Sequence, residues 1–163
     1  METQTGRFRV ASFVVMVGIA EGRHAPIVAE PNIFAKWKSC APYLLSLLRI
    51  VSALMFIHFG TMILFAFPFG MPAGSTANVM SEAWIGGVLE VVGGGLLLLG
   101  LFTRPVAFIL AGEMAVAYFQ FHAPQSFWTV VNMGTPAVLY CFVWLYISAA
   151  GAGPWSLDAR RGK

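Results

Sequence analysis

The sequence contains few charged residues. Lys and Arg together number 10 and Asp and Glu number 7, so charged residues make up 10% of the 163-residue chain, whereas soluble domains carry about 25%. Hydrophobic residues make up 58% of it. A chain this poor in charge has too few groups to solvate a globular surface. The composition therefore indicates a membrane protein.

Cysteine is also scarce, and its scarcity excludes several kinds of site. The two cysteines, Cys40 and Cys141, form no C-x-x-C pair, and no His/Cys cluster has metal-ligand spacing. We therefore expect no disulfide, no metal site and no thiol-redox enzyme that uses its own cysteines. The sequence also lacks a GxGxxG motif at a strand-to-helix junction and a Walker-type Lys, so its glycine runs give no support to nucleotide binding.

Four long apolar segments dominate the rest of the chain, at about residues 43–67, 82–101, 105–121 and 128–150. A helix of about 20 residues, with a rise of about 1.5 Å per residue, spans the roughly 30 Å hydrocarbon core of a bilayer. The sequence therefore predicts an all-α fold, an integral membrane four-helix bundle over residues 42–151, followed by a short cytoplasmic tail over 152–163. Ser81 and Thr103 are predicted N-caps, and Pro136 is a predicted kink in the fourth span.

Residues 1–41 are predicted to form a cytoplasmic tail that is disordered or lies on the membrane surface. Within it, Ile33 to Ser39 combine aromatic and basic residues, which favours a short interfacial helix. The alternative is a signal peptide, because the basic start is followed by a short apolar run from Val10 to Ala20.

The positions of the basic residues predict the orientation. The net charge is +3, but nine of the ten Lys and Arg residues flank the apolar segments, so we expect no nucleic-acid partner. These nine residues are Arg7, Arg9, Arg23, Lys36, Lys38, Arg104, Arg160, Arg161 and Lys163. Because Lys and Arg accumulate in short loops on the cytoplasmic side, we expect a multi-pass protein of a bacterial-type inner membrane with both termini in the cytoplasm.

Four ionisable residues lie inside the predicted spans, where a charge is costly. Counted from the inner end of each span, Arg49 and Glu113 lie roughly 9 and 12 Å deep, and His58 and Glu90 roughly 22 and 17 Å deep. Two pairs are therefore hypothesised, an Arg49–Glu113 ion pair and a His58–Glu90 hydrogen bond. These pairs would hold the bundle together, or the four residues would form a polar site for a proton, a quinone or a small solute. Arg49 alone would also be able to snorkel to the interface.

Several motifs together resemble the DoxX family of small membrane proteins over about residues 34–159. The motifs are Leu48-Arg49-Ile50-Val51, His58-Phe59-Gly60, Glu90-Val91-Val92-Gly93-Gly94, Gly100-Leu101-Phe102-Thr103-Arg104-Pro105, Glu113-Met114, Asn132 and Gly153-Pro154-Trp155-Ser156-Leu157-Asp158. The turn at 100–105 and the C-terminal segment are the most specific of them. The resemblance implies a four-helix membrane protein with an inward-facing polar cluster, in which Arg49, His58, Glu90 and Glu113 stand where the family carries intramembrane polar groups.

The fourth helix departs from the family pattern. Members often begin it with an Asn-Gly-Gly-Glu-like stretch, whereas this chain has Asn132-Met133-Gly134-Thr135-Pro136 and lacks the acid. Asn132 remains a candidate member of the polar site. No activity that depends on the missing carboxylate is expected.

The resemblance implies a role in the lipid bilayer. The family is named after a subunit of a quinone-linked thiosulfate-oxidising complex, so we expect a non-catalytic or quinone-contacting subunit of a membrane redox assembly. Its expected partners are oxidoreductase subunits, and a quinone is the candidate cofactor. Two alternatives remain open: a small permease or proton-conducting module that uses Glu90, Glu113 and His58, and a scaffold that binds partner helices through its glycine faces. A homo-oligomer is also an open alternative.

Overall fold

The computed structural model describes residues 32–71 and 74–162, with side chains from Lys36 onward. The expectations for residues 1–31, a disordered or interfacial tail with a signal peptide as its alternative, lie outside the described residues. The chain divides into two units, residues 1–39 and 40–163. In the first unit, residues 32–39 are helical, which agrees with the helix predicted at Ile33–Ser39.

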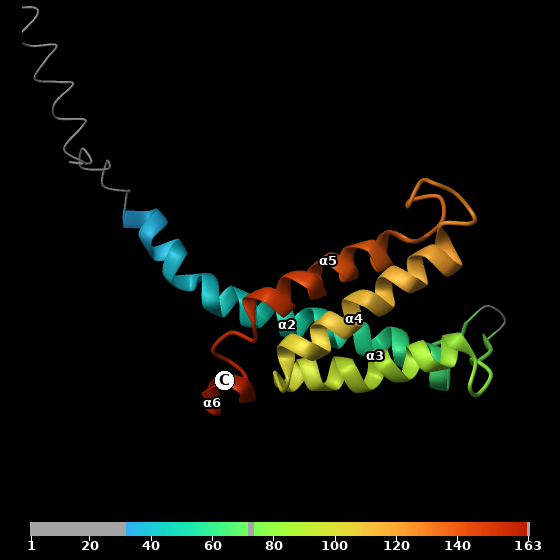
Figure 1. Cartoon of the computed structure of the whole chain (residues 1–163), viewed down its shortest axis with the longest axis horizontal. Coiled ribbons are helices and arrows are strands. Elements are labelled where there is room, and N and C mark those ends of the chain that lie inside the picture. Colours follow the sequence, from blue (N-terminus) through green and yellow to red (C-terminus); the bar gives the residue numbers. More distant parts are fainter. Residues whose placement is uncertain (1–31, 72–73, 163) are drawn as a thin grey trace, which may run out of the picture. The chain divides into compact units, whose positions relative to one another are not determined.

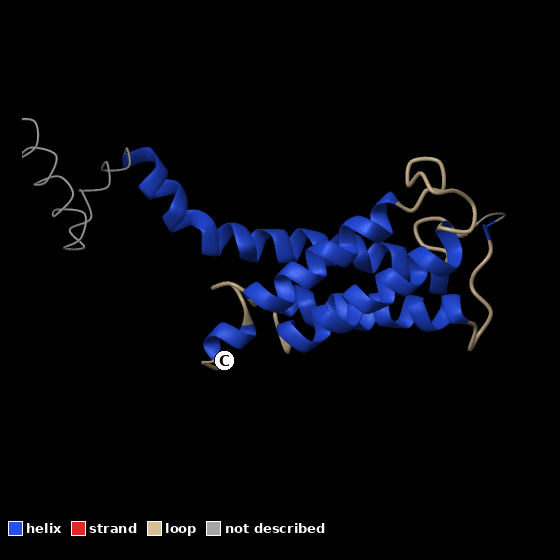
Figure 2. Ribbon diagram, turned by 45° about the horizontal axis from the view of Figure 1, so that its top comes forward, coloured by secondary structure: helices blue, strands red, loops and turns tan. Residues whose placement is uncertain are grey.

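The described residues are helical and contain no β-strand beyond one isolated bridge between Met71 and Ser75. The helices are α2 (Asn32–Phe65), α3 (Glu82–Leu99), α4 (Thr103–Ala117), the π-helix η2 (Tyr118–His122), α5 (Thr135–Ala150) and the short α6 (Leu157–Arg160). Figure 1 and Figure 2 show that, within the unit 40–163, these helices form a bundle. The prediction of an all-α bundle is confirmed.

The connection between α3 and α4 follows from residues that end and begin helices. Ser81 caps α3, because its hydroxyl accepts a hydrogen bond from the backbone N–H of Trp84 at 3.2 Å. Gly100 ends α3 with a φ of +66°, the left-handed conformation that glycine adopts at little cost. Thr103 is the first residue of α4 and not its N-cap, which is Phe102. The caps predicted for the two helices are thus right for Ser81 and wrong for Thr103.

The fourth apolar segment is helical over a shorter range than predicted. The helix begins at Thr135 rather than near Trp128, and residues 128–134 form turns. Pro136 lies in the first turn of α5 and does not kink it, because a proline near the start of a helix removes no intrahelical hydrogen bond. The chain reaches that start through Met133, whose φ is +58°. The predicted spans at 82–101 and 105–121 agree with α3 and with α4–η2 to within a few residues at their ends. The first span was predicted to begin at residue 43, after Pro42, but α2 begins at Asn32 and continues through Pro42, so the predicted boundary between tail and span is wrong.

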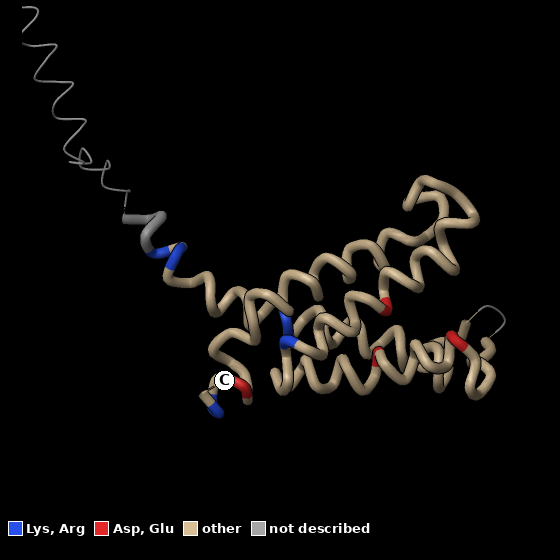
Figure 3. The backbone as a smooth tube through the Cα atoms, in the orientation of Figure 1, with Lys and Arg blue, Asp and Glu red and all other residues tan. Residues whose placement is uncertain are grey.

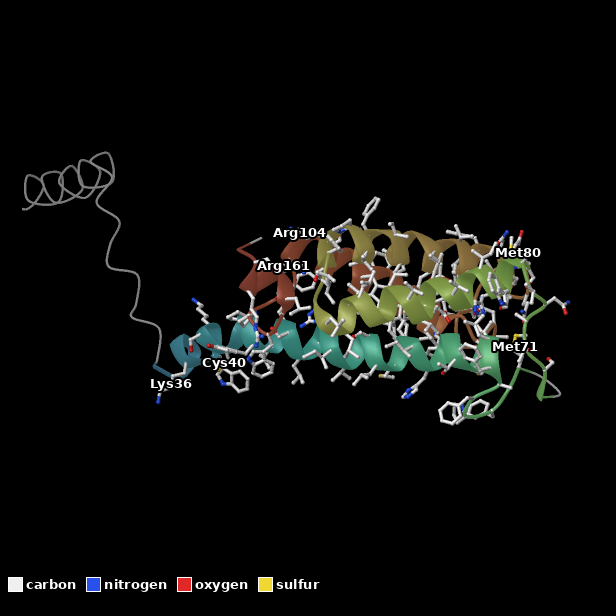
Figure 4. The ribbon with its side chains drawn as sticks, turned by 90° about the horizontal axis from the view of Figure 1, so that it is seen from below. Lys36, Cys40, Met71, Met80, Arg104 and Arg161 are labelled. Carbon is white, nitrogen blue, oxygen red and sulfur yellow. The ribbon has the colours of Figure 1, made fainter. Side chains whose placement is uncertain are left out.

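The core of the bundle is apolar, and so is much of its outer surface. Fully buried side chains from α2, α3, α4 and α5 meet in one cluster that includes Phe56, Leu97, Leu110 and Trp144. Large apolar side chains are also exposed on all four of these helices, and Figure 4 shows side chains projecting outward along them. A soluble surface rarely carries so much contiguous apolar area, so this surface fits the interior of a bilayer.

Two helices are long and apolar enough to cross a membrane, over Lys36–Phe65 and Glu82–Leu99, and Thr135–Ala150 is a shorter apolar helix. Within the unit 40–163, Arg104 and Arg161 lie at one end of the bundle, whereas Met71 and Met80 lie at the other (Figure 4). Lys and Arg residues of this unit gather at the end where the C-terminus lies (Figure 3). The two ends of the bundle therefore differ in charge.

Candidate functional site

A pair of acidic residues lies inside the bundle. Glu90 of α3 is 5% exposed and Glu113 of α4 is partly buried. The Glu113 carboxylate lies against Gly86, which precedes Glu90 by about one helical turn and so lies on the same face of α3, and Figure 3 shows acidic positions on both helices. One oxygen of each, Oε2, is buried without a hydrogen-bond partner among the described residues. The structure thus brings together two acids that the sequence assigned to different pairs.

Glycines make room for these acids where three helices meet. A Cβ at Gly60 of α2 would lie 2.9 Å from the Cβ of Glu90 and 2.8 Å from the carbonyl oxygen of Gly87. A Cβ at Gly86 would lie 3.3 Å from Oε1 of Glu113. Because these three glycines have no side chain, α2 and α4 approach α3 closely on either side of Glu90. The carboxyl group of Glu113 therefore lies beside space that a side chain at position 86 would fill.

Aromatic residues border the acid pair on the α5 side. Tyr140 lies within electrostatic reach of Glu90. Its ring stacks on that of Trp144, with centroids 5.7 Å apart, and both rings contact Phe56 of α2. Trp144 is fully buried, and its indole N–H has no hydrogen-bond partner in the described part of the chain. On the α5 side, the polar residue within electrostatic reach of Glu90 is therefore Tyr140.

His58 does not join the acid pair, so the hypothesised His58–Glu90 hydrogen bond is wrong. Gly60 is the residue that faces α3, and a residue two positions away on a helix points about 200° around the axis. The His58 side chain is consequently exposed on the outer face of α2. There it lines a cavity of about 430 Å³. We call this cavity the His58 pocket, and its lining residues are His58, Phe59, Met62, Phe67, Pro68 and Phe69.

Arg49 binds backbone carbonyls instead of Glu113, so the hypothesised ion pair is also wrong. Its guanidinium is fully buried and donates hydrogen bonds to the carbonyl oxygens of Leu97 and Leu98, at the end of α3, and to those of Ala152 and Trp155. Carbonyls at a helix end carry partial negative charge and have no partner within the helix. Arg49 therefore finds its acceptors at the C-terminus of α3 and in the C-terminal segment, and it does not snorkel to the surface.

Asn132 lies at the end of the bundle opposite Arg49, where its side chain stabilises a turn. It is 1% exposed and lies in the turns before α5, not within the helix. Its amide donates to the carbonyl of Ser126 and its side-chain oxygen accepts from the N–H of Gly134, both at 2.8 Å. His122 donates from Nδ1 to the Asn132 carbonyl, also at 2.8 Å. Asn132 thus holds the connection between η2 and α5 and lies apart from the acid pair.

Asp158 is a polar residue that the sequence did not single out as a site. Its carboxylate accepts hydrogen bonds from the backbone N–H groups of Phe102 and Thr103, at 3.0 and 2.8 Å. Partial burial by itself raises the pKa of Asp158, but the hydrogen bonds from Thr103 and Phe102, together with the positive charge of Arg161, outweigh it, so the pKa is lowered from its ordinary value of 3.8. In the sequence, the turn at 100–105 and the C-terminal segment at 153–158 stood out only because each resembles a family motif. That resemblance did not show that they bind each other.

The remaining polar contacts at this end join α4 to α5. Arg104 donates hydrogen bonds to the carbonyl oxygens of Ser148 and Ala149, in the last turn of α5. A cation there complements the negative end of the helix dipole. Among the described residues, no group of three or more His, Cys, Asp and Glu side chains is arranged to hold a metal ion.

Comparisons with known proteins agree with this architecture. A family model described as DoxX matches residues 44–123. An uncharacterised protein of Haemophilus influenzae is 46% identical over 120 residues, which make up 72% of this chain and 90% of that relative. No solved structure matches the chain.

Proposed function

Because the chain belongs to the DoxX family of membrane proteins, we propose that it is a subunit of a membrane redox assembly and contacts a quinone in the His58 pocket. The observation that carries this proposal is the pocket itself, a cavity of about 430 Å³ with one imidazole among apolar walls. Pockets for small molecules measure about 300–1,000 Å³ and combine apolar walls with a few polar groups.

The lining residues fit the head of a quinone. Such a head is a flat conjugated ring with two carbonyl oxygens, which accept hydrogen bonds, and an apolar tail. A ring N–H of His58 is the donor for one carbonyl, and the rings of Phe59 and Phe67 supply aromatic faces and edges for the quinone ring. His58 and Phe59 are exposed on α2, so a lipid-soluble ligand would enter directly from the bilayer.

In this assembly the chain binds and orients, and an oxidoreductase partner supplies or accepts the electrons. A quinone, when bound, would supply the capacity to carry two electrons and two protons. His58 would hold the quinone head at one carbonyl, and the apolar walls would keep water away from the ring. The chain has no catalytic role of its own in this proposal.

The membrane placement that goes with this role is a four-span protein of the inner membrane with both termini in the cytoplasm. We assign the spans to α2, α3, α4 with η2, and α5. Support comes from the nine flanking basic residues of the sequence. The gathering of Lys and Arg at one end of the unit 40–163 (Figure 3) also supports it.

Quinone binding can be tested with the purified full-length chain in lipid nanodiscs. A photoreactive short-chain quinone is titrated, and the labelled residues are mapped by mass spectrometry. We expect labels within residues 58–69. His58→Phe keeps a ring but removes the N–H, so binding should weaken by about 1 kcal/mol, or about fivefold in Kd. Met55→Leu changes an exposed residue of the same helix outside the pocket and should have no effect.

Two results would contradict the quinone contact. Labels spread over the whole outer surface would mean that the quinone merely dissolves in the lipid. Equal binding by the His58→Phe and parent proteins would mean that the imidazole does not hold the ligand. The redox assembly is tested separately, by purification from native membranes in mild detergent and mass spectrometry of the bound proteins. We expect an oxidoreductase subunit among them, in amounts similar to those of this chain.

A further inference from the structure

The proposed quinone contact does not use Glu90 and Glu113, and the burial of both acids needs its own explanation. A carboxylate in an apolar interior is costly unless a cation, hydrogen-bond donors or a proton offsets its charge. Glu90 is 5% exposed, and Oε2 of each acid is buried without a hydrogen-bond partner among the described residues. These acids therefore lack the usual compensation for a buried charge.

The neighbouring helices offer no cation to the pair. On the α2 side, the residue against Glu90 is Gly60, and His58 points to the outer surface. On the α5 side, the titratable neighbour of Glu90 is Tyr140. Arg49 donates its hydrogen bonds to carbonyls at the other end of α3. In the described part of the chain, the charge that faces Glu90 is therefore another negative one, that of Glu113.

Glycines border both acids, Gly86 at the carboxyl group of Glu113 and Gly60 at the Cβ of Glu90. A methyl group at Gly86 would press on Oε1 of Glu113 at 3.3 Å, and one at Gly60 would meet the Cβ of Glu90 at 2.9 Å. The glycines and the unpartnered oxygens are two separate features, and both are expected if the interior holds a polar species.

We propose that Glu90 and Glu113 form a proton-binding site in which the two carboxyl groups share one proton. Two adjacent acids in an apolar site do not both ionise, and their protons come off in two coupled steps. Holding one proton leaves one negative charge on the pair instead of two. Glu113 is the more exposed of the two, so the proton enters and leaves through Glu113, and Glu90 is the deeper acceptor.

The test is labelling of the full-length chain in nanodiscs with a lipid-soluble carbodiimide, which reacts with protonated carboxyl groups. We expect one label per chain, mapped by mass spectrometry to Glu90 or Glu113, at neutral pH. In Glu113→Gln, Glu90 loses its negative neighbour and ionises more readily, so the pH at which its labelling is half-maximal should fall by about one unit, as for a coupling of about one pK unit. Glu90→Gln should lower the half-maximal pH for labelling of Glu113 in the same way. Glu82→Gln, at the exposed start of α3, is the matched control and should label like the parent.

Four outcomes would overturn the proposal. An unlabelled parent protein means that neither acid is protonated. Two labels on one chain mean that each acid holds its own proton. Labelling of the remaining acid that is unchanged in both single variants means that the two are not coupled. If the variants do not fold, infrared spectra of the parent protein still test the proposal. The proposal requires the carbonyl band of one protonated carboxylic acid per chain. No such band, or bands of two protonated acids, would refute it.

Discussion

The carboxylate of Asp158 accepts a hydrogen bond from the backbone N–H of Thr103 at 2.8 Å, and this contact joins the C-terminal segment to the start of α4. In the same region, the N–H of Asp158 donates to the carbonyl of Gly100 at 2.9 Å. Thr103 and Gly100 belong to the turn between α3 and α4. This turn and the C-terminal segment are the two most specific parts of the family resemblance, and the structure shows that they bind each other.

The first prediction concerns Asp158→Ala, which removes the acceptor for two N–H groups at the start of α4. We expect a loss of about 1 kcal/mol of stability at neutral pH, the usual cost of losing a helix cap. Because the folded-state pKa is lowered from 3.8, this contribution is fully present above pH 3.8. It disappears as the pH falls through the lower folded-state pKa. Thermal unfolding in detergent at several pH values measures it.

The control for this prediction is Arg160→Ala, an exposed change in the same short helix. It should leave the unfolding temperature unchanged at every pH. A deficit of Asp158→Ala that stays constant from neutral pH to well below pH 3.8 would show that the carboxylate charge plays no part in the contact.

The second prediction concerns Arg49→Leu, which leaves several carbonyl oxygens of α3 and the C-terminal segment without a donor. Each buried group without a partner costs about 1–3 kcal/mol, so the variant should lose at least about 3 kcal/mol. Arg49→Lys should recover only part of this loss. A guanidinium donates hydrogen bonds from three nitrogen atoms in a planar fork, whereas an ammonium group donates from a single nitrogen and cannot reach all of these carbonyls. Unfolding in detergent, together with the yield of folded protein, is the measurement.

A double-mutant cycle checks which partner Arg49 uses. In the structure Arg49 and Glu113 do not pair, so the combined Arg49→Leu and Glu113→Leu changes should add their separate losses to within about 0.5 kcal/mol. Rescue of the first change by the second would instead support an ion pair between them.

The sequence predicted the helices well because their signal is local. Runs of apolar residues mark the spans, and Ser81, a residue type that commonly caps helices, marks the start of α3. The start of α5 was placed wrongly because residues 128–134 are nearly as apolar as the helix that follows. What keeps them out of the helix is the side chain of Asn132, which binds Ser126 and Gly134 across the turn.

The pairing of the intramembrane residues was beyond sequence reasoning for two physical reasons. Depth along a span says which side chains lie at one level, but not which way each one faces, and His58 faces away from Glu90 because Gly60 makes the helix contact. Arg49 binds main-chain carbonyls, which every residue carries and which no sequence pattern marks. The sequence named Arg49, His58, Glu90, Glu113 and Asn132 as one candidate set, whereas the structure distributes them over four places in the unit 40–163.

The third prediction concerns topology. Reporter fusions at the C-terminus and in the loop near Ser75 should report opposite sides of the membrane, with the C-terminus cytoplasmic, because the flanking Lys and Arg residues favour that side. A matched check is Arg104→Gln, which should weaken the orientation signal of the loop between α3 and α4 without inverting the protein. A C-terminus on the periplasmic side would reject the assignment.

The fourth prediction concerns Asn132→Ala, which removes two side-chain hydrogen bonds within the connection between η2 and α5. We expect a loss of about 1–3 kcal/mol, because the carbonyl of Ser126 loses its partner. The N–H of Gly134 keeps the carbonyl of Thr129 as a second acceptor. Faster hydrogen exchange should be confined to residues 123–134. If Asn132 instead acts together with the acid pair, carbodiimide labelling of Glu90 would change in this variant, and we expect that it does not.

The last prediction compares two glycines on the helices that enclose the acid pair. Gly60→Ala would place a methyl group 2.7 Å from Cγ2 of Val91 and 2.8 Å from the carbonyl oxygen of Gly87. A backbone carbonyl cannot move aside cheaply, so α2 must separate from α3, at about 1–3 kcal/mol. Gly95→Ala is the matched control in α3, because nothing lies within 4 Å of its added Cβ. It should be neutral or stabilising by up to about 1 kcal/mol, since alanine favours the helix. Unfolding temperatures in detergent measure both changes, and equal values for the two variants would mean that α2 and α3 do not cross at Gly60.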